Sequence, residues 1–404
     1  MRILILLLTL ITFASLAMAQ DTKDKVEIGV QTTSLTVFYP DVAFDDTKGG
    51  IGGRVTYNFN RSLAAEAELN FFPQKQLIFE SNGRSIQGQF GVKIGKRFEK
   101  FGLFAKVRPG FISAGDVVSF KPEAQVPPTI PSKVTVARET FFTVDLGGVL
   151  ELYPSRRLVV RFDAGDTVIR HPERFVPFGF GGPLVRARGP KLSHNFQLTA
   201  GVGFRLGDFP DEEPDVDTAG EMEKRFEVGV QFTSLFVDPS NSQGSIFFPR
   251  IHTEPGFGGR LTYNLTESIA FEAEGNYFTR EQFGLPEGGK MFQGQFGGKI
   301  GKRFDRWGVF GKARPGFVGF TRVLQSPFGV PLPPFSFERR LYPSVDLGGV
   351  VEFYVSPRWL ARFDVGDTII RYGEIEFAGF PPSFTVPSVT RHNLQVSTGI
   401  GFRF

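Results

Sequence analysis

Charged residues occur at alternate positions in many segments of this 404-residue sequence, and the pattern of the first half recurs in the second. Opposite charges confined to one phase of such segments can pair inside an enclosed space, where an unpaired charge would cost several kcal/mol. We predict a paired set comprising Arg54, Glu66, Glu68, Lys93, Arg97, Lys106, Arg108, Asp145, Glu151, Arg161, Asp163 and Arg205 in the first half, and Arg260, Glu272, Glu274, Lys299, Arg303, Lys312, Arg314, Asp346, Glu352, Arg362, Asp364 and Arg403 in the second.

These charges allow two interpretations. Because the two signs are nearly balanced, they can fill an interior completely and leave no route for solutes. Alternatively, they can line a narrow or gated ion path. Glycines on the same phase would make room for the long charged side chains; they are Gly91, Gly95, Gly147, Gly165, Gly201 and Gly203.

A second set of residues has the types required for nucleophilic hydrolysis. Ser34, Asp166 and His194 would form a catalytic triad if the fold brought them together, and the second half repeats them as Ser234, Asp367 and His392. The simpler interpretation is that these residues are polar groups on an exposed rim.

The elements that must position these residues are β-strands. Residues 87–98 and 293–304 are identical except at Val92 and Gly298, and apolar residues alternate with polar ones along both segments. This period of two predicts strands with one apolar and one polar face. Charge along the whole inner phase suits a barrel that has lipid outside and a polar lumen inside.

The chain contains two copies of one unit, approximately 26–206 and 226–404. Short turns alternate with long connections, as in membrane barrels with short periplasmic turns and long extracellular loops. The first copy predicts eight strands, at about 26–34, 50–59, 63–72, 86–98, 101–112, 141–153, 157–168 and 194–206. A proline within the fifth strand of each copy, Pro109 and Pro315, predicts a bulge or bend there.

We therefore predict an all-β fold of two tandem eight-stranded antiparallel transmembrane barrels. The acidic, proline-containing segment 207–224 reads as a periplasmic linker between them. One sixteen-stranded barrel is the alternative, because the last strand of one copy runs antiparallel to the first strand of the next. That arrangement would enclose a water-filled channel.

Residues 1–19 have the charged start, apolar core and small-residue end of a signal peptide, with cleavage expected near Ala19-Gln20. No later run of about 18 apolar residues predicts a transmembrane helix. The sequence has no cysteine, and its net charge of +4 gives no indication of nucleic-acid binding. Because we find no metal-binding or phosphate-binding motif, we expect neither a metal nor a cofactor.

The chain ends with Ile400, Phe402 and Phe404 on one phase, which resembles the sorting signal of bacterial outer-membrane barrels. Together with eight strands per unit, this resembles the small barrels of the OmpA-transmembrane-domain/OmpX class, here as a tandem duplication. The resemblance implies a location in the bacterial outer membrane, contact with outer-membrane lipid and insertion by the barrel-assembly machinery.

The predicted extracellular loops are rich in Pro and Phe, which suits either contact with an extracellular ligand or loops that fold on themselves over the barrel mouth. They include 126–131, 174–184, 326–337 and 376–384. The leading hypothesis is therefore a non-enzymatic outer-membrane protein with a structural or surface-interaction role. The second is a porin-like channel for ions or small solutes. The third is a hydrolase of outer-leaflet lipid, which depends on the Ser–His–Asp set.

Overall fold

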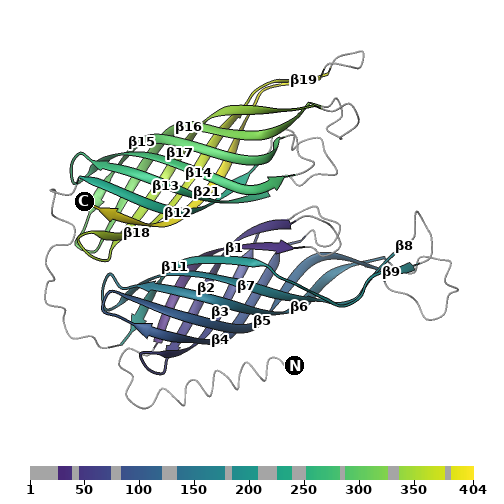
Figure 1. Cartoon of the computed structure of the whole chain (residues 1–404), viewed down its shortest axis with the longest axis horizontal. Helices are drawn as coiled ribbons and strands as arrows, with labels where there is room; N and C mark the ends of the chain where they lie inside the picture. Colours follow the sequence, from purple (N-terminus) through teal and green to yellow (C-terminus); the bar gives the residue numbers. More distant parts are fainter. Residues whose placement is uncertain are drawn as a thin grey trace.

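The computed structural model describes residues 26–38, 45–73, 83–120, 134–177, 184–207, 225–238, 252–282, 287–325, 336–377 and 384–404. These residues form two separate antiparallel barrels that lie side by side with their short turns at the same end (Figure 1). The predicted signal peptide and nearly all of the predicted linker lie outside the described residues. Within the described ranges, no helix is long and apolar enough to cross a membrane.

The first barrel contains eight strand positions, the last of which is split into two strands. Its wall runs in the order β1, β2, β3, β4, β5, β6, β7 and β11, with β10 continuing the eighth position beside β7. The strands are β1 (Val26–Phe38), β2 (Asp45–Asn58), β3 (Leu63–Phe72), β4 (Ser85–Arg97), β5 (Phe101–Phe120), β6 (Val134–Leu152), β7 (Leu158–His171), β10 (Lys191–Ser193) and β11 (Phe196–Leu206).

The second barrel repeats this arrangement with an unbroken last strand. Its strands are β12 (Phe226–Val237), β13 (His252–Asn264), β14 (Ile269–Gln282), β15 (Glu287–Arg303), β16 (Trp307–Gln325), β17 (Ser336–Tyr354), β18 (Trp359–Tyr372) and β21 (Val389–Arg403). Two small hairpins lie outside the barrel walls, formed by β8 (Arg174–Pro177) with β9 (Leu184–Arg188) and by β19 (Ile375–Phe377) with β20 (Phe384–Val386).

Each barrel closes on itself. β11 pairs with β1, with Val26 opposite Leu206, and β21 pairs with β12, with Glu227 opposite Arg403. The predicted fold of two tandem eight-stranded barrels is confirmed, and the sixteen-stranded alternative is wrong. Once β11 has satisfied the free edge of β1, its backbone groups are no longer available to β12.

Several strands extend farther than the alternation predicts. β5 continues to Phe120 and β6 begins at Val134, whereas the alternating pattern ends near 112 and resumes near 141. Backbone pairing does not require an apolar outer face once a hairpin has left the membrane.

The bulge predicted at Pro109 is absent. The pairing of β4 with β5 keeps one register on both sides of it, with Gln89 opposite Gly110 and Val92 opposite Val107. The ladder omits the pairs between these positions, which accommodates the missing N–H of proline. The irregularity in β5 lies farther along the strand, between Ala114 and Val117 in its pairing with β6.

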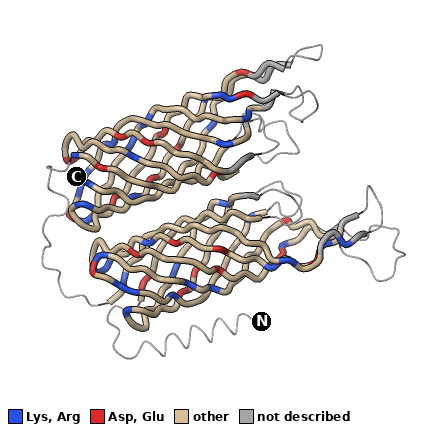
Figure 2. The backbone as a smooth tube through the Cα atoms, in the orientation of Figure 1, with Lys and Arg blue, Asp and Glu red and all other residues tan. Residues whose placement is uncertain are grey.

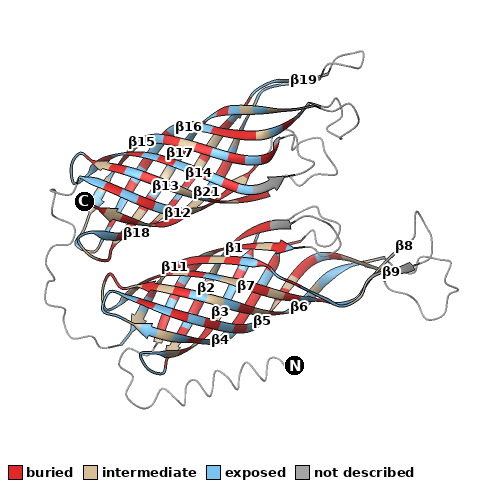
Figure 3. Ribbon diagram, viewed as in Figure 1, coloured by how far each residue is buried: buried red, intermediate tan, exposed pale blue. Residues whose placement is uncertain are grey.

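Burial alternates along the strands (Figure 3). Apolar residues such as Val30 (70% exposed) and Ile300 (64% exposed) point outward, while charged residues such as Lys93 and Glu66 are buried inside the wall. This distribution is the reverse of a water-soluble fold and is typical of a wall that faces lipid.

Candidate functional site

The predicted charged residues line the lumens of the two barrels. Charged positions of both signs are spread along both walls (Figure 2). Most of these side chains are buried. The exceptions are Arg97, Arg205 and Arg303, near the ends that carry the short turns, which are half-buried.

One arginine joins three strands of the first barrel. Arg108 on β5 lies 2.6 Å from Glu68 on β3 and 2.6 Å from Asp145 on β6. Lys106, two residues away on the same strand, lies 2.7 Å from Asp145 and also contacts Asp163 on β7. The acidic partners therefore come from strands on both sides of the cations.

A second group of charges lies closer to the short turns. Glu66 accepts hydrogen bonds from both terminal nitrogens of Arg161 and lies 3.2 Å from Lys93. Lys93 also contacts Glu151, which accepts a hydrogen bond from the Tyr153 hydroxyl at 2.8 Å. Because Arg108 also lies 3.8 Å from Glu66, the two groups form one connected network.

The second barrel repeats this geometry. Arg314 lies 2.6 Å from both Glu274 and Asp346, matching Arg108 in the first barrel. Arg362 donates to Glu272 as Arg161 donates to Glu66. The network is therefore a property of the repeated unit.

Sequence reasoning missed one member in each barrel. Glu27 is buried on β1 and accepts a hydrogen bond from Arg54 at 2.7 Å, and Glu227 accepts one from Arg260 at 2.8 Å. The available signal was the inward phase of β1, which runs through Glu27, Gly29 and Gln31. These carboxylates compensate the charge of two buried arginines.

Small residues make this packing sterically feasible. A Cβ on Gly165 would lie 2.6 Å from Asp145 Oδ1 and 3.1 Å from Lys106 Cε. A Cβ on Gly203 would lie 2.6 Å from Glu27 Oε1. Glycine at these positions leaves the space that the ion pairs occupy.

Above the charges lies a layer of amide side chains, which sequence reasoning also missed. Gln31 donates to Asn70 at 2.9 Å, and Asn70 donates to Glu68 at 2.6 Å and to Gln87 at 3.1 Å. Gln87 in turn donates to Gln197 at 2.9 Å across the lumen. The second barrel contains the same chain of Gln231, Asn276, Gln293 and Gln395.

The lumen becomes apolar toward the end with the long connections. Inward-facing side chains pack together in each barrel, among them Leu35, Phe72 and Ile169 in the first. The cluster in the second barrel is larger, comprising Leu235, Val237, Phe278, Met291, Val318, Phe320, Val323, Tyr342, Ile370 and Tyr372. A solute would have to displace this apolar layer, the amides and the ion pairs in turn.

The sequence profile of the outer membrane protein beta-barrel domain family matches residues 5–205, which contain all but the last residue of the first barrel's wall. This chain is a bacterial outer-membrane β-barrel protein. Each of its two copies folds as an eight-stranded barrel, so the expected location and the resemblance to small outer-membrane barrels are confirmed.

Several solved structures are similar to this outer-membrane protein. The N-terminal barrel of Pseudomonas aeruginosa OprF is 9% identical (46% of this chain, 100% of that chain, TM-score 0.26), and Yersinia pestis Ail is 12% identical (46% and 99%, TM-score 0.28). A Pseudomonas aeruginosa FadL homologue is 12% identical (96% and 92%, TM-score 0.28). No curated protein matches the chain.

Aromatic residues gather around the ends of both barrels that carry the short turns. Phe304 stacks on Trp307 at 4.2 Å between ring centres, and Phe98 stacks on Phe101 at 4.6 Å. Phe404, at the end of the chain, stacks on Phe226 at 6.1 Å. Such aromatic girdles mark the membrane interface of outer-membrane barrels. The alternate residues Ile400, Phe402 and Phe404, the predicted sorting signal, lie on the outer face of this end.

The structure brings together two members of the hypothetical triad but not the third. His194 Nδ1 lies 2.6 Å from Asp166 Oδ2, and the pair His392–Asp367 has the same distance. Ser34 lies opposite Leu198, four residues from His194, which corresponds to roughly 13 Å along the strand. Ser234 is likewise opposite Val396, four residues from His392. The register therefore separates each serine from its histidine, and the hypothetical triad is not formed.

The loops predicted to bind a ligand are described only at their edges. Segment 126–131 lies outside the described residues, and the other three contribute the short strands β8, β9, β19 and β20 and the start of β17.

Proposed function

We propose that this protein is a non-conducting, non-enzymatic outer-membrane protein with a structural and surface-interaction role. The observation that carries the proposal is the connected network of buried ion pairs in each lumen, joining Arg108 and Arg161 to carboxylates on β3, β6 and β7. An eight-stranded barrel has an interior just wide enough for side chains, and here charged side chains occupy it.

Opening an ion path would require separating these pairs. Removing one partner of a buried pair costs about 3–5 kcal/mol, and Arg108 alone has close contacts with both Glu68 and Asp145. The amide and apolar layers are in series with the charges. A mobile gate would have to disrupt all three layers, so the lumen serves as a rigid scaffold.

The scaffold supports hairpins that extend beyond the membrane. β5 and β6 are 20 and 19 residues long, whereas about 9–11 residues suffice to cross the membrane. This end of the first barrel carries five exposed cations, and one of them, Arg186, pairs with the exposed Glu173 at 3.3 Å. The five are Arg84, Arg138, Arg170, Arg186 and Lys191. This positive rim favours an anionic partner at the cell surface.

The surface role can be tested separately from the absence of conductance. Replacing the five rim cations with glutamine in the full-length protein should abolish binding to an anionic polysaccharide. The variant should still fold, which is shown by a difference in gel mobility between unboiled and boiled samples. A control variant with three exposed cations of the short-turn end replaced, Arg156, Arg157 and Arg358, should bind normally. Equal binding by the two variants would refute the surface role of the rim.

A further inference from the structure

The two barrels contact each other along one line of their walls, which we call the seam. Near the short turns, Arg306 Nη1 donates to the Pro154 carbonyl at 3.0 Å. Farther along, Phe162 on β7 stacks on Phe363 on β18 with ring centres 6.3 Å apart, and β2 lies against β13. Because the short turns of both barrels lie at one end (Figure 1), both barrels can cross the same membrane, and the seam then lies within the lipid.

The seam joins equivalent surfaces of the two copies. Phe162 and Phe363 occupy the same position in their barrels, opposite Ala200 and Thr398 of the last strand, and β2 is the equivalent of β13. A surface that contacts its own equivalent indicates an approximate two-fold axis, which here runs along the barrels. The two copies are therefore arranged like the subunits of a homodimer, although one chain carries both.

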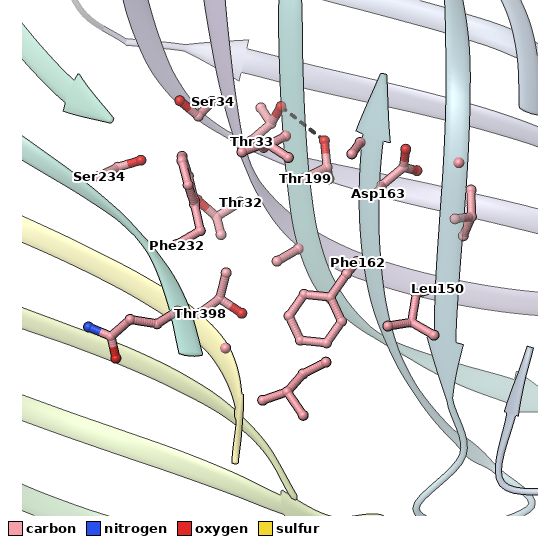
Figure 4. A pocket seen from close by; sticks show the side chains of 18 of the residues that line it. Thr32, Thr33, Ser34, Leu150, Phe162, Asp163, Thr199, Phe232, Ser234 and Thr398 are labelled. Atoms are coloured by element: carbon pink, nitrogen blue, oxygen red, sulfur yellow. Dashed lines mark hydrogen bonds between the residues drawn. The ribbon is translucent and has the colours of Figure 1, made fainter. Parts of the chain in front are cut away.

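The outer faces of β1 and β12 are buried where they enter the seam. Ser34 is 5% exposed and Ser234 is 7% exposed, whereas Val30 and Val230, on the same faces of the same strands, are 70% and 68% exposed. Both serines line a space of about 560 Å³ that remains between the two walls (Figure 4). The equivalent position of each barrel therefore lies in the seam rather than against lipid.

Next to the buried serines, the two copies differ in a complementary way. Thr36 of the first copy corresponds to Phe236 of the second, and Gly49 corresponds to Pro255, as the strand register of the two barrels shows. The Phe236 ring lies so close to Gly49 that a Cβ on this glycine would be 2.6 Å from ring atom Cε1. The second barrel therefore places a large side chain where the first barrel has none.

This difference favours the pairing of unlike copies. Inside a membrane, lipid tails are as apolar as the barrel walls, so close packing of complementary shapes decides which surfaces associate. Two first barrels on the same two-fold axis would place Thr36 beside Gly49 and leave a gap. Two second barrels would place Phe236 beside the Pro255 ring, which occupies the space that Gly49 leaves open. Where β12 meets β2, the unlike pair avoids both the gap and the overlap.

We propose that the seam is a docking interface that holds the second barrel against the first, and that Phe236 and Gly49 determine which copies pair. The partner of each surface is the other barrel of the same chain. The two barrels then occupy the membrane as one unit, rather than as two domains joined only by segment 207–224. This inference does not depend on whether either lumen conducts.

The first test measures whether the two faces lie together in a membrane. The chain has no cysteine, so Ser34→Cys combined with Ser234→Cys introduces a unique pair of thiols on the seam. In liposomes that hold the full-length protein, a short bis-maleimide should link them. A protease site placed in segment 207–224 identifies linked protein on a denaturing gel, because only linked protein keeps its full mass after cleavage. The control pair Ile94→Cys and Ile300→Cys, on the outer faces of β4 and β15, should link at least fivefold more slowly. Equal linking of the two pairs would overturn the proposal.

The second test exchanges residues between the copies in the protein that carries Ser34→Cys and Ser234→Cys. Gly49→Pro introduces the residue that β13 carries at the equivalent position, and it should slow linking roughly tenfold because the proline overlaps Phe236. Adding Phe236→Thr, the residue of the first copy, should restore linking. Val92→Gly also copies the second barrel but lies on β4, outside the seam, and should have no effect. Linking that is unchanged by Gly49→Pro, or not restored by Phe236→Thr, would overturn the proposed choice of partner.

A difference in gel mobility between unboiled and boiled samples identifies the variants that fold. If Gly49→Pro does not fold, Phe236→Thr alone removes the same contact from the other side of the seam. It should also slow linking of the two thiols, because it leaves a gap beside Gly49. Linking at the rate of the parent protein would overturn the proposal.

Discussion

Arg108 Nη1 donates a hydrogen bond of 2.6 Å to Glu68 Oε2, although β4 separates the strands that carry these two residues. The bond therefore reaches past a neighbouring strand inside the lumen. Arg314 and Glu274 form the same bond at 2.6 Å in the second barrel. Each of these bonds connects two non-adjacent strands of the wall through side chains in the lumen.

Replacing Arg108 by Ala should strongly destabilise the first barrel. The change leaves Glu68 and Asp145 buried without their main partner, and breaking a buried pair in this way typically costs about 3–5 kcal/mol. The loss of stability would be measured by unfolding the first copy alone with urea in detergent. The folded fraction would be read from gels, on which folded and boiled protein migrate differently. Arg84→Ala, an exposed arginine of the same barrel, should change stability by less than about 0.5 kcal/mol. Similar losses for both variants would contradict the importance of the network.

Glycines that face the network should not tolerate a side chain. A Cβ on Gly366 would contact Asp346 Oδ1 and lie 2.9 Å from Lys312 Nζ, so Gly366→Ala should cost about 1–3 kcal/mol through overpacking. Gly275→Ala in the same barrel is the control, because nothing lies within 4 Å of its added methyl group. Unfolding midpoints that rank the two variants in the opposite order would show that the interior is looser than described.

The first barrel should fold without the second. Its wall closes through β1 and β11, and no strand of the second barrel completes it. Residues 20–206 refolded in detergent should therefore migrate differently before and after boiling. A fragment that stays unshifted, when the full chain shifts, would mean that closure depends on the second copy.

The exposed histidines should have no catalytic effect on lipid. His194 is 74% exposed, whereas Ser34 is buried and lies opposite Leu198, four residues from His194. His194 therefore cannot activate Ser34. Replacing His194 and His392 by Ala should leave the acylation pattern of lipid A unchanged in mass spectra. A consistent change in acyl-chain number would revive the hydrolase hypothesis.

Alternation alone predicted the strands and the charged lumen, because residues such as Lys93 and Arg97 occupy one phase between apolar neighbours. It failed where alternation stops. Val37 and Ile169 are buried in the lumen near the end with the long connections. Apolar residues face inward there, so an apolar side chain does not indicate which face of the strand points to the membrane. Glu27 was missed because its strand presents mostly small or neutral side chains to the interior.

Alternation by itself gives neither the register nor the choice between the two ways of closing the wall. The separation of Ser34 from His194 depends on which residues pair between β1 and β11. A shift of four residues in this pairing would bring the two side chains together, and every side chain would still point to the same face of the wall. Closure within each copy and closure across both copies use antiparallel partners equally well. The preference for β1 as the partner of β11 becomes visible only when the whole wall is assembled.

The most direct test of the account is single-channel recording of the full-length protein in planar lipid bilayers. We predict no conductance steps above the bare bilayer at neutral pH, because ion pairs, amides and an apolar layer fill both lumens in series. The folded state of the inserted protein should be verified by the heat-dependent gel shift of the same sample. Stable, ohmic channel steps from the wild-type protein would contradict the account and favour a porin-like function.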